Sequence, residues 1–600
     1  MGSSRGHRRP PVSSRALRLT AAAALFSLCL SGRPQPAAAQ PSPNLLPWLR
    51  TQAASETPVL GTGLEVQGAP AIPPGSVIGE VRVNAKDIFD SARPGEDRKI
   101  FRLANRLHRT TRPVVIERQL LFQPGDVFSP ELIAESARLL RRNDYLYDVD
   151  LKPVLRDDGK VDVEVTTRDL WTLQGGASFS RSGGENNTSF SLEDTNFLGT
   201  GKEISLSRIG TVDRTSNLVR YRDPNVLGSR VRLTASYADN SDGGRTRFEL
   251  ERPFYSLSSR WSAGLRSFRD ERVENLYKAG KVVTNFEHRH DFVEVYGGLS
   301  PGLVNGTARR FRLGVTYSTD TFVRSSLGPL QFPFLIPKAQ LPQQQLFDAP
   351  ENRTLVYPWI GFESVQDRFV VERDLNRFQR AEDLNLGRQY NVLLGWSSPA
   401  FGGDGERLIV QSAFSAGWRP TARNLVLAQV GGSTRWAAGD AEDLTAGGRV
   451  RWYARDFGEH IFYASLGADL AHRLDGEDQL LLGGDSGLRG YPLRYQAGDR
   501  RVLLTLEQRF FSDREIFHLA HLGGAVFFDA GQAWFVGPLS KLDARFYQER
   551  RILKDAGLGL RLGSSRSSRG AVLHLDVAFP LDGSSSIERV QYLVSTSDTF

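Results

Sequence analysis

The chain has 600 residues, of which 58 are glycine and 10% are aromatic, and it contains one cysteine, Cys29, and one methionine, Met1. Six of the 76 basic residues precede Gln40, where no acid occurs, so 70 bases face 68 acids in the rest of the chain and the net charge there is +2. Because the charges nearly balance, the composition gives no indication of a nucleic-acid partner. Because no cysteine follows Gln40, that part of the chain has no disulfide, no thiolate nucleophile and no cysteine metal site.

The first 39 residues are predicted to be a secretory signal peptide. Five arginines and no acid precede the apolar run at 19–30, and three alanines at 37–39 follow it. Signal peptides have this order of basic region, apolar core and small-residue cleavage site. A transmembrane helix is the alternative, but it needs about 20 apolar residues. Since no later segment reaches about 18 consecutive apolar residues, we expect only strands to cross a membrane.

A flexible leader and a small folded domain are predicted to follow. Residues 40–76 are rich in Pro, Ala, Gly and Ser and show no sustained period. Residues 77–170 contain one strand, then helices, then two strands. The clearest helix begins at Pro130, because Ser129 is a good N-cap and proline suits the first turn. An earlier helix near 98–108 has one apolar stripe, formed by Ile100, Phe101, Ala104 and Leu107.

From residue 171 to residue 600 a two-residue alternation replaces the helical period. Phe311, Leu313, Val315 and Tyr317 alternate with Arg312, Gly314, Thr316 and Ser318. A soluble β-sandwich also alternates, but it rarely needs some 430 residues in one domain. We therefore predict a mainly β fold, an antiparallel transmembrane β-barrel of about 16 strands behind one small α+β domain. The long polar stretches Ser325–Asn352 and Gln366–Gly387 are predicted to be outer loops, because irregular backbone in lipid leaves peptide groups unsatisfied.

The most specific stretch is 482–491, LGGDSGLRGY, which precedes an alternating strand at 502–511. It resembles the outer-membrane barrel assembly superfamily, which includes BamA/TamA-like proteins and two-partner secretion transporters. In that family a long outer loop folds into the lumen and ends in a motif written V/L-R-G-F/Y. The residues that match this motif are Leu488, Arg489, Gly490 and Tyr491.

The same resemblance implies that Glu507 and Asp529 are the lumenal partners of Arg489. An arginine inside a barrel needs a carboxylate partner, and Glu507 shares the face of its strand with Thr505 and Arg509, opposite apolar neighbours.

Both ends of the chain also resemble this family. The element order of residues 77–170 resembles a polypeptide-transport-associated (POTRA) domain. The terminal aromatic Phe600, on the same parity as Tyr592 and Val594, matches the family's sorting signal. Thr596 and Asp598 share that parity and depart from the apolar pattern. Only one POTRA-like domain fits before the barrel, whereas the essential assembly factor has several.

The resemblance implies assembly of β-barrel proteins in the bacterial outer membrane, or polypeptide translocation across it, with the POTRA-like domain in the periplasm. A lateral gate is expected where the strand beginning near Leu173 meets the strand ending at Phe600. The expected partners are the outer-membrane bilayer and unfolded or exported polypeptides, with periplasmic chaperones or accessory lipoproteins as further candidates.

Other functions stay open at this point. A transporter or passive pore for lipid or solute, without assembly activity, is the alternative, and a surface attachment protein is a third. An enzyme is not expected: Gly484-Asp485-Ser486-Gly487 also matches a protease nucleophile motif, but the lumenal-loop motif explains these residues better. No cofactor and no metal are expected, since His288 and His290 form half a site without further ligands at suitable spacing.

Overall fold

The computed structural model describes residues 72–90, 92, 96–324, 349–376, 378, 381–457, 460–516, 519–536, 551–565, 572–582 and 587–597. The predicted signal peptide and nearly all of the predicted leader therefore lie outside the described residues. Within the described ranges, no helix has both the length and the apolar character that a membrane-spanning helix needs.

The N-terminal domain is a three-stranded sheet covered by helices. Its elements are β1 (Ile78–Lys86), α3 (Lys99–Leu107), α4 (Pro113–Glu117), α5 (Pro130–Arg141), β2 (Leu146–Leu155) and β3 (Val161–Asp169). The sheet order is β1-β3-β2, with β3 parallel to β1 and antiparallel to β2. Helix α5 begins as predicted, because the Leu132 N–H donates to Ser129 Oγ at 3.3 Å. The core contains Ile133 and Leu140 of α5 and Val163 and Val165 of β3.

Helix α3 forms where the sequence predicts a helix, but only part of its apolar stripe is buried. Phe101 and Ala104 are buried, but Ile100 and Leu107 of the predicted stripe are 47% and 67% exposed. The buried side meets Phe89 and, from the connection between two barrel strands, Leu519. Helix α3 therefore lies at the junction between the domain and the barrel, and one apolar side of it is left uncovered.

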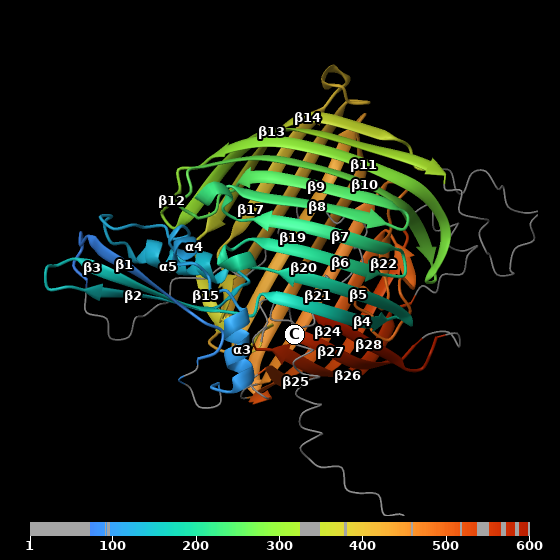
Figure 1. The fold of residues 1–600 in the computed structure, drawn as a ribbon. Coiled ribbons are helices and arrows are strands. Elements are labelled where there is room, and N and C mark those ends of the chain that lie inside the picture. Colours follow the sequence, from blue (N-terminus) through green and yellow to red (C-terminus); the bar gives the residue numbers. More distant parts are fainter. Residues whose placement is uncertain are drawn as a thin grey trace, which may run out of the picture.

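Twenty strands close into one antiparallel barrel in their order along the chain, and the last strand pairs with the first (Figure 1). The first ten are β4 (Leu173–Ser182), β5 (Glu185–Asp194), β6 (Glu203–Gly210), β7 (Thr215–Asp223), β8 (Arg232–Asn240), β9 (Gly243–Arg252), β10 (Trp261–Lys278), β11 (Lys281–Leu299), β13 (Thr307–Arg324) and β14 (Arg353–Gln366). The other ten are β17 (Gln389–Ser397), β18 (Arg407–Thr421), β19 (Asn424–Ala437), β20 (Asp440–Phe457), β21 (His460–His472), β24 (Arg500–Ile516), β25 (Ala520–Trp534), β26 (Leu553–Ser564), β27 (Val572–Pro580) and β28 (Gln591–Ser597). The two-residue strand β12 (Leu303–Val304) lies in the connection from β11 to β13.

The predicted number of about 16 strands is wrong. It came from dividing residues 171–600 among strands of about ten residues joined by long outer loops. Several connections at the end away from the N-terminal domain are instead two-residue turns, such as Gly183-Gly184 and Ala279-Gly280. The positive φ angles at these turns suit tight hairpins. Short turns use little chain, and this leaves room for four more strands.

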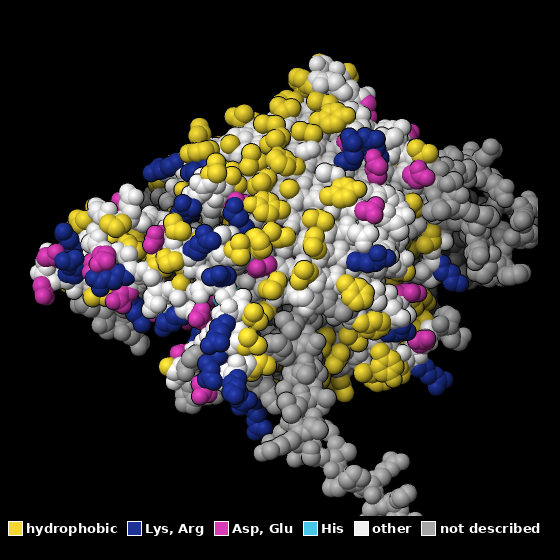
Figure 2. Space-filling model, viewed as in Figure 1, with side chains coloured by type: hydrophobic (Ala, Val, Ile, Leu, Met, Phe, Trp, Pro, Cys, Tyr) yellow, Lys and Arg dark blue, Asp and Glu magenta, His cyan; other side chains and the backbone are white. Residues whose placement is uncertain are grey.

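The barrel is apolar outside and polar inside, as the alternation predicts. Phe311, Leu313 and Val315 on β13 are 57%, 68% and 53% exposed, whereas Thr316, which follows them on the opposite face, is fully buried on the lumenal side. Figure 2 shows hydrophobic side chains spread over the outer wall of the strands. An apolar surface of this kind would be unfavourable in water, whereas it is expected on a barrel that is surrounded by lipid.

The stretch Gln366–Gly387 is not an outer loop, contrary to the prediction. It forms a hairpin of β15 (Phe369–Arg373) and β16 (Ala381–Asn385) at the barrel end next to the N-terminal domain. Leu375 and Phe378 at its tip are buried against residues of the barrel interior. The hairpin enters the lumen and satisfies much of its own backbone by pairing with itself, an arrangement that polarity alone does not reveal. In the other predicted loop, residues 325–348 lie outside the described residues.

Candidate functional site: lumenal loop, hairpin and seam

The connection between β21 and β24 folds into the barrel from the end away from the N-terminal domain. It contains β22 (Leu480–Leu482) and β23 (Gln496–Gly498), which pair with each other. Gly484 lets the arms of this lumenal loop lie close together and against the β4–β5 turn. An added Cβ there would lie 2.5 Å from the Tyr491 carbonyl oxygen and 2.9 Å from the Gly183 Cα. The sequence motif lies between the two arms.

Arg489 points from this loop to the lumenal wall, where Glu507 and Asp529 lie. It donates two hydrogen bonds to Asp529, at 2.7 Å from Nε and 3.0 Å from Nη2, and one to Glu507 at 2.8 Å from Nη1. Its guanidinium carbon lies 3.5 Å from the centre of the Phe527 ring. Both carboxylates are buried. The two-pronged contact, the second carboxylate and the aromatic face together orient the guanidinium.

The other motif residues fill the space around Arg489. Leu488 and Tyr491 are fully buried in one apolar cluster with residues of β25 and β26. The Tyr491 hydroxyl donates to the Asp582 carbonyl at 2.7 Å and accepts from the Lys554 N–H at 3.2 Å. Gly490 has no space for a side chain, because a Cβ would lie 2.6 Å from the Asp555 Cβ. Each motif position thus has a distinct steric or polar requirement.

Arg509 connects the lumenal loop to the hairpin. Its Nε donates to Glu507 Oε2 at 2.9 Å, while Arg489 holds the other oxygen of Glu507. Its Nη1 donates to the Leu375 carbonyl, at the hairpin tip, at 2.9 Å. Glu507 therefore links a loop from one end of the barrel to a hairpin from the other. The sequence indicates that Glu507 and Arg509 share one face of their strand. It does not indicate that Arg509 also bonds the hairpin.

The base of the hairpin contacts the N-terminal domain. Arg138 on α5 lies 3.5 Å from Asp367, and Arg141 lies 3.5 Å from Asp383. Glu135 on the same helix accepts from the Leu257 N–H in the β9–β10 connection at 2.5 Å. Burial raises the pKa of Glu135, and that N–H opposes the rise. Helix α5 is therefore attached both to the barrel rim and to the hairpin inside it.

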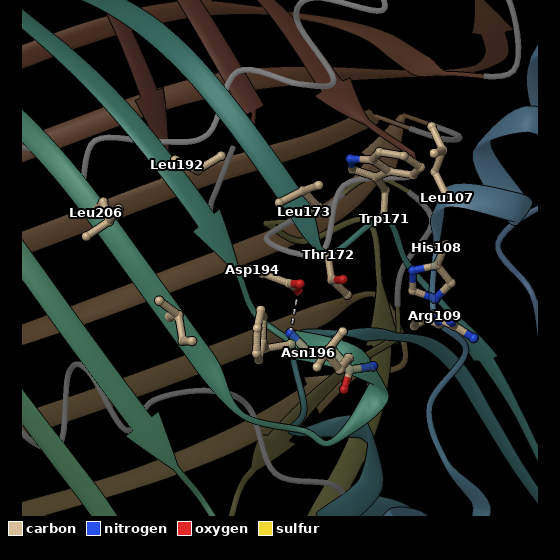
Figure 3. A pocket seen from close by; sticks show the side chains of 13 residues that line it. Leu107, His108, Arg109, Trp171, Thr172, Leu173, Leu192, Asp194, Asn196 and Leu206 are labelled. Carbon is tan, nitrogen blue, oxygen red and sulfur yellow. Dashed lines mark hydrogen bonds between the residues drawn. The ribbon is translucent and has the colours of Figure 1, made fainter.

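A second joint lies where the domain meets β4, β5 and β6 (Figure 3). Asp169 at the end of β3 accepts from the Thr111 N–H at 2.7 Å and lies 2.9 Å from His108 Nε2. Thr111 Oγ1 in turn accepts from Asn196 Nδ2, in the β5–β6 connection, at 2.8 Å. Gly199 touches the same segment, since a Cβ there would lie 2.5 Å from the Thr110 carbonyl oxygen. The domain is thus hydrogen-bonded to the rim beside the first barrel strand.

Among the described residues, the seam between β28 and β4 is the least extensively paired junction of the barrel wall. Its register there contains one pair, Val594 with Arg181, whereas β27 and β28 share seven pairs and β4 and β5 share ten. Tyr592 is exposed on the outer side, and Val594 and Thr596 on the same parity are half-buried. Phe600 and Asp598 lie outside the described residues.

The lumenal loop contacts the strands on both sides of this seam. Ser182, the last residue of β4, donates from Oγ to the Gly484 carbonyl at 2.7 Å. On the other side Tyr491 bonds Asp582, which follows β27. The loop also reaches the β10–β11 turn, where the Gly280 N–H donates to the Arg494 carbonyl at 3.1 Å. It therefore bridges the first and last parts of the barrel from inside.

Among the described residues, one group of acids is close enough to share a cation: Asp443, Asp475 and Asp478, at the far mouth of the barrel. The histidines that the sequence offered as half a metal site are engaged otherwise. His288 Nε2 lies 2.9 Å from Asp320, and His290 Nε2 lies 3.1 Å from Ser318 Oγ.

A closed antiparallel barrel with an apolar wall and a charged lumen defines an outer-membrane β-barrel protein. Residues 107–168 match the POTRA family model, described as surface antigen variable number repeat. The chain thus combines a POTRA match in its N-terminal domain with a closed antiparallel barrel.

Solved structures that match this chain include BamA from Haemophilus ducreyi lacking POTRA domains 1–3. That chain is 15% identical, with a TM-score of 0.37, over 87% of this chain and 85% of that chain. CdiB from Escherichia coli is 13% identical, with a TM-score of 0.43, over 87% and 76% of the two chains. CdiB from Acinetobacter baumannii is 10% identical, with a TM-score of 0.40, over 92% and 96%. No curated protein matches the sequence.

Proposed function

We propose that this protein assembles β-barrel proteins in the outer membrane or moves polypeptides across it, without catalytic chemistry. The POTRA domain would lie in the periplasm and the lumenal loop would enter from the cell surface. The seam is the observation that supports this most directly, because a single register pair joins β28 to β4 over the part of the chain that the structure describes. Backbone groups left unpaired at such an edge favour pairing with a strand from another chain, which is the behaviour of a lateral gate.

The lumenal loop would control how firmly this gate closes. It is bonded to Ser182 at one side of the seam and to Asp582 near the other. Arg489 anchors the loop to the wall through Asp529 and Glu507. An opening of the seam would therefore have to break or stretch these contacts. A more firmly anchored loop would raise the free energy needed to open the gate.

The POTRA domain would receive the client. In the described sheet β2 has one neighbour, β3, so its outer edge presents backbone groups to solvent. An extended segment of an unfolded polypeptide can add to such an edge without a particular sequence. Periplasmic chaperones or accessory lipoproteins are proposed as further partners of this domain.

A disulfide across the seam tests the proposal. Paired residues on adjacent strands lie within disulfide range, and the chain after residue 39 has no cysteine of its own. We expect a variant with cysteines at Arg181 and Val594 to lose function when oxidised and to regain it on reduction. The measurement is the outer-membrane proteome of cells that depend on the variant.

The matched control is a cysteine pair at Val577 and Tyr592, which joins β27 to β28 and leaves the seam free. Oxidation of this pair should have no effect on the proteome. Full function with the seam locked would argue against a lateral gate. Loss of membrane conductance together with an unchanged proteome on depletion would indicate a pore instead.

A further inference from the structure

Four acidic side chains gather at the outer mouth of the barrel, where the lumenal loop begins. Asp443 lies near the start of β20, and Asp475, Glu477 and Asp478 lie just after β21. Carboxylate oxygens of Asp443, Asp475 and Asp478 lie within 4.8 Å of one another. Two separate segments of the chain therefore bring acids to one place.

Two arginines neutralise part of this acid cluster. Arg435 Nη2 donates to both oxygens of Asp475, at 2.6 Å and 2.8 Å, and its Nη1 lies 3.3 Å from Asp443 Oδ2. Arg353 Nη1 lies 3.1 Å from Asp475, and its Nη2 pairs with Glu477. Four carboxylates share two guanidinium groups, and Arg353 also pairs with Asp320 at 3.3 Å, so the negative charges of the cluster exceed the positive ones.

Asp478 is the member that neither arginine bonds. It is 8% exposed, and both of its carboxylate oxygens are buried without a hydrogen-bond partner. One oxygen each of Asp443 and Glu477, Oδ1 and Oε2, is in the same condition. Burial, and then the charge of Glu477, raises the pKa of Asp478. A buried carboxylate without a partner is strongly unfavourable, so these oxygens need a cation or a proton.

We propose that Asp443, Asp475 and Asp478, with Glu477 beside them, bind one calcium ion through the carboxylate oxygens that the arginines leave free. A hard divalent cation prefers carboxylate oxygens and would cancel the excess charge. Calcium accepts irregular sets of carboxylates, whereas magnesium demands a regular octahedron and keeps much of its water. The ion would fasten the first residues of the lumenal loop to β20. Extracellular calcium modules bind with dissociation constants on the order of 10⁻⁴ to 10⁻³ M, and this affinity suits a cell-surface site.

Calorimetric titration of the refolded mature protein in detergent, after removal of divalent ions, tests the site. We expect one calcium ion to bind per chain, magnesium to bind more weakly, and calcium to raise the unfolding temperature. Asp478→Asn should abolish the binding and the calcium-dependent shift. Asp440→Asn should change neither the binding nor the shift. Asp440 lies on β20 with Asp443, but its side chain is exposed and pairs with Arg473.

The absence of calcium binding to the wild-type protein at millimolar concentration would overturn the proposal without any variant. Binding that persists in Asp478→Asn would also overturn it, because the ion would then lie elsewhere. Neither result bears on the lateral gate, which is tested separately by the seam disulfide.

A second surface, independent of the acid cluster, is formed by helix α3. Ile100, Leu103 and Leu107 lie on one face of the helix and are 47%, 54% and 67% exposed. The adjacent face is basic and exposed, with Lys99, Arg102 and Arg106, and α3 contains no acid. Such a helix, with separate apolar and basic faces, is typical of segments that lie in a membrane interface.

The apolar face of α3 continues the lipid-facing wall of the barrel. Leu107 and Leu173, Leu192 and Leu206 of β4, β5 and β6 line one cavity of about 310 Å³ (Figure 3). The three barrel leucines are exposed on the outside of the wall. Figure 1 shows α3 running across the strand ends at this rim of the barrel.

We infer that α3 lies in the periplasmic leaflet of the membrane and contacts anionic phospholipid. Its three apolar side chains would enter the acyl boundary, and its basic side chains would meet the headgroup phosphates. This position would hold the POTRA domain beside the seam. The inference depends on the barrel spanning a membrane and is separate from any transport activity.

Nitroxide labels on single cysteines test this position in the full mature chain, reconstituted in vesicles. We expect a label at Leu103→Cys to be accessible to oxygen and shielded from a water-soluble nickel reagent. A label at Val154→Cys should show the opposite, because Val154 is equally apolar and 44% exposed but lies on β2. Phosphatidylglycerol should increase the shielding at residue 103 relative to pure phosphatidylcholine.

Equal access of the nickel reagent to both labels would overturn the inference. Hydrogen exchange of residues 99–107 in the unlabelled protein provides a second measurement that no label disturbs. Slower exchange in vesicles than in aqueous detergent supports the inference, and an unchanged rate contradicts it.

Discussion

Arg489→Ala is expected to lower the unfolding temperature of the barrel markedly, because it leaves Asp529 buried without the guanidinium that holds it and removes one of the two arginines that bond Glu507. Removal of one partner from a buried ion pair costs about 3–5 kcal/mol. The Phe527 ring would also lose its cationic neighbour. The measurement is thermal unfolding in detergent, followed by circular dichroism and by the heat-dependent shift in electrophoretic mobility.

Arg473→Ala is the matched control, since Arg473 lies at the start of the same loop. Its side chain is 54% exposed and pairs with the equally exposed Asp440. Exposed pairs contribute about 0–1 kcal/mol, so little change is expected. Arg489→Lys should recover part of the loss, because it restores the charge but not the two-pronged geometry. Similar unfolding temperatures for both alanine variants would contradict an anchoring role for Arg489.

Deletion of the hairpin at residues 369–385, replaced by a short polar linker, is expected to raise ion conductance in planar bilayers several-fold. Leu375 and Phe378 at its tip are buried against the lumenal wall, and Arg509 bonds the Leu375 carbonyl. A barrel of this many strands encloses a channel unless polypeptide fills it. The hairpin lies inside the barrel at the end next to the N-terminal domain, so its removal would widen the lumen there.

Point substitutions separate plugging from general damage to the barrel. Phe378 is 6% exposed and stacks near His521 and Phe511, so Phe378→Ser should also increase conductance. Val371 lies on the same hairpin but is 44% exposed, and Val371→Ser should leave conductance unchanged. Unchanged conductance in the deletion variant would show that the hairpin does not seal the lumen.

Local patterns were enough to predict the class of fold, and they single out residues that lie together in the lumen. The two-residue alternation at Phe311 to Tyr317 predicts which side faces lipid, because adjacent side chains on a strand point to opposite faces. The same parity places Glu507 inside the barrel, where it meets Arg489. These features depend on neighbours in the sequence or on a short motif, so they can be read without knowing the overall arrangement.

Only the tertiary structure decided the features that depend on distant segments. The number of strands is set by many turns, and each tight turn such as Gly183-Gly184 changes the division of the chain. In the sequence, the hairpin at 369–385 looks like an outer loop because it is polar, and α3 looks like a helix with one face in the core. The polarity of a residue indicates whether it is buried, but it does not indicate which distant segment lies next to it. The chain of contacts from Arg489 through Glu507 and Arg509 to the Leu375 carbonyl joins segments more than 100 residues apart, and they meet because a loop and a hairpin fold into the same lumen.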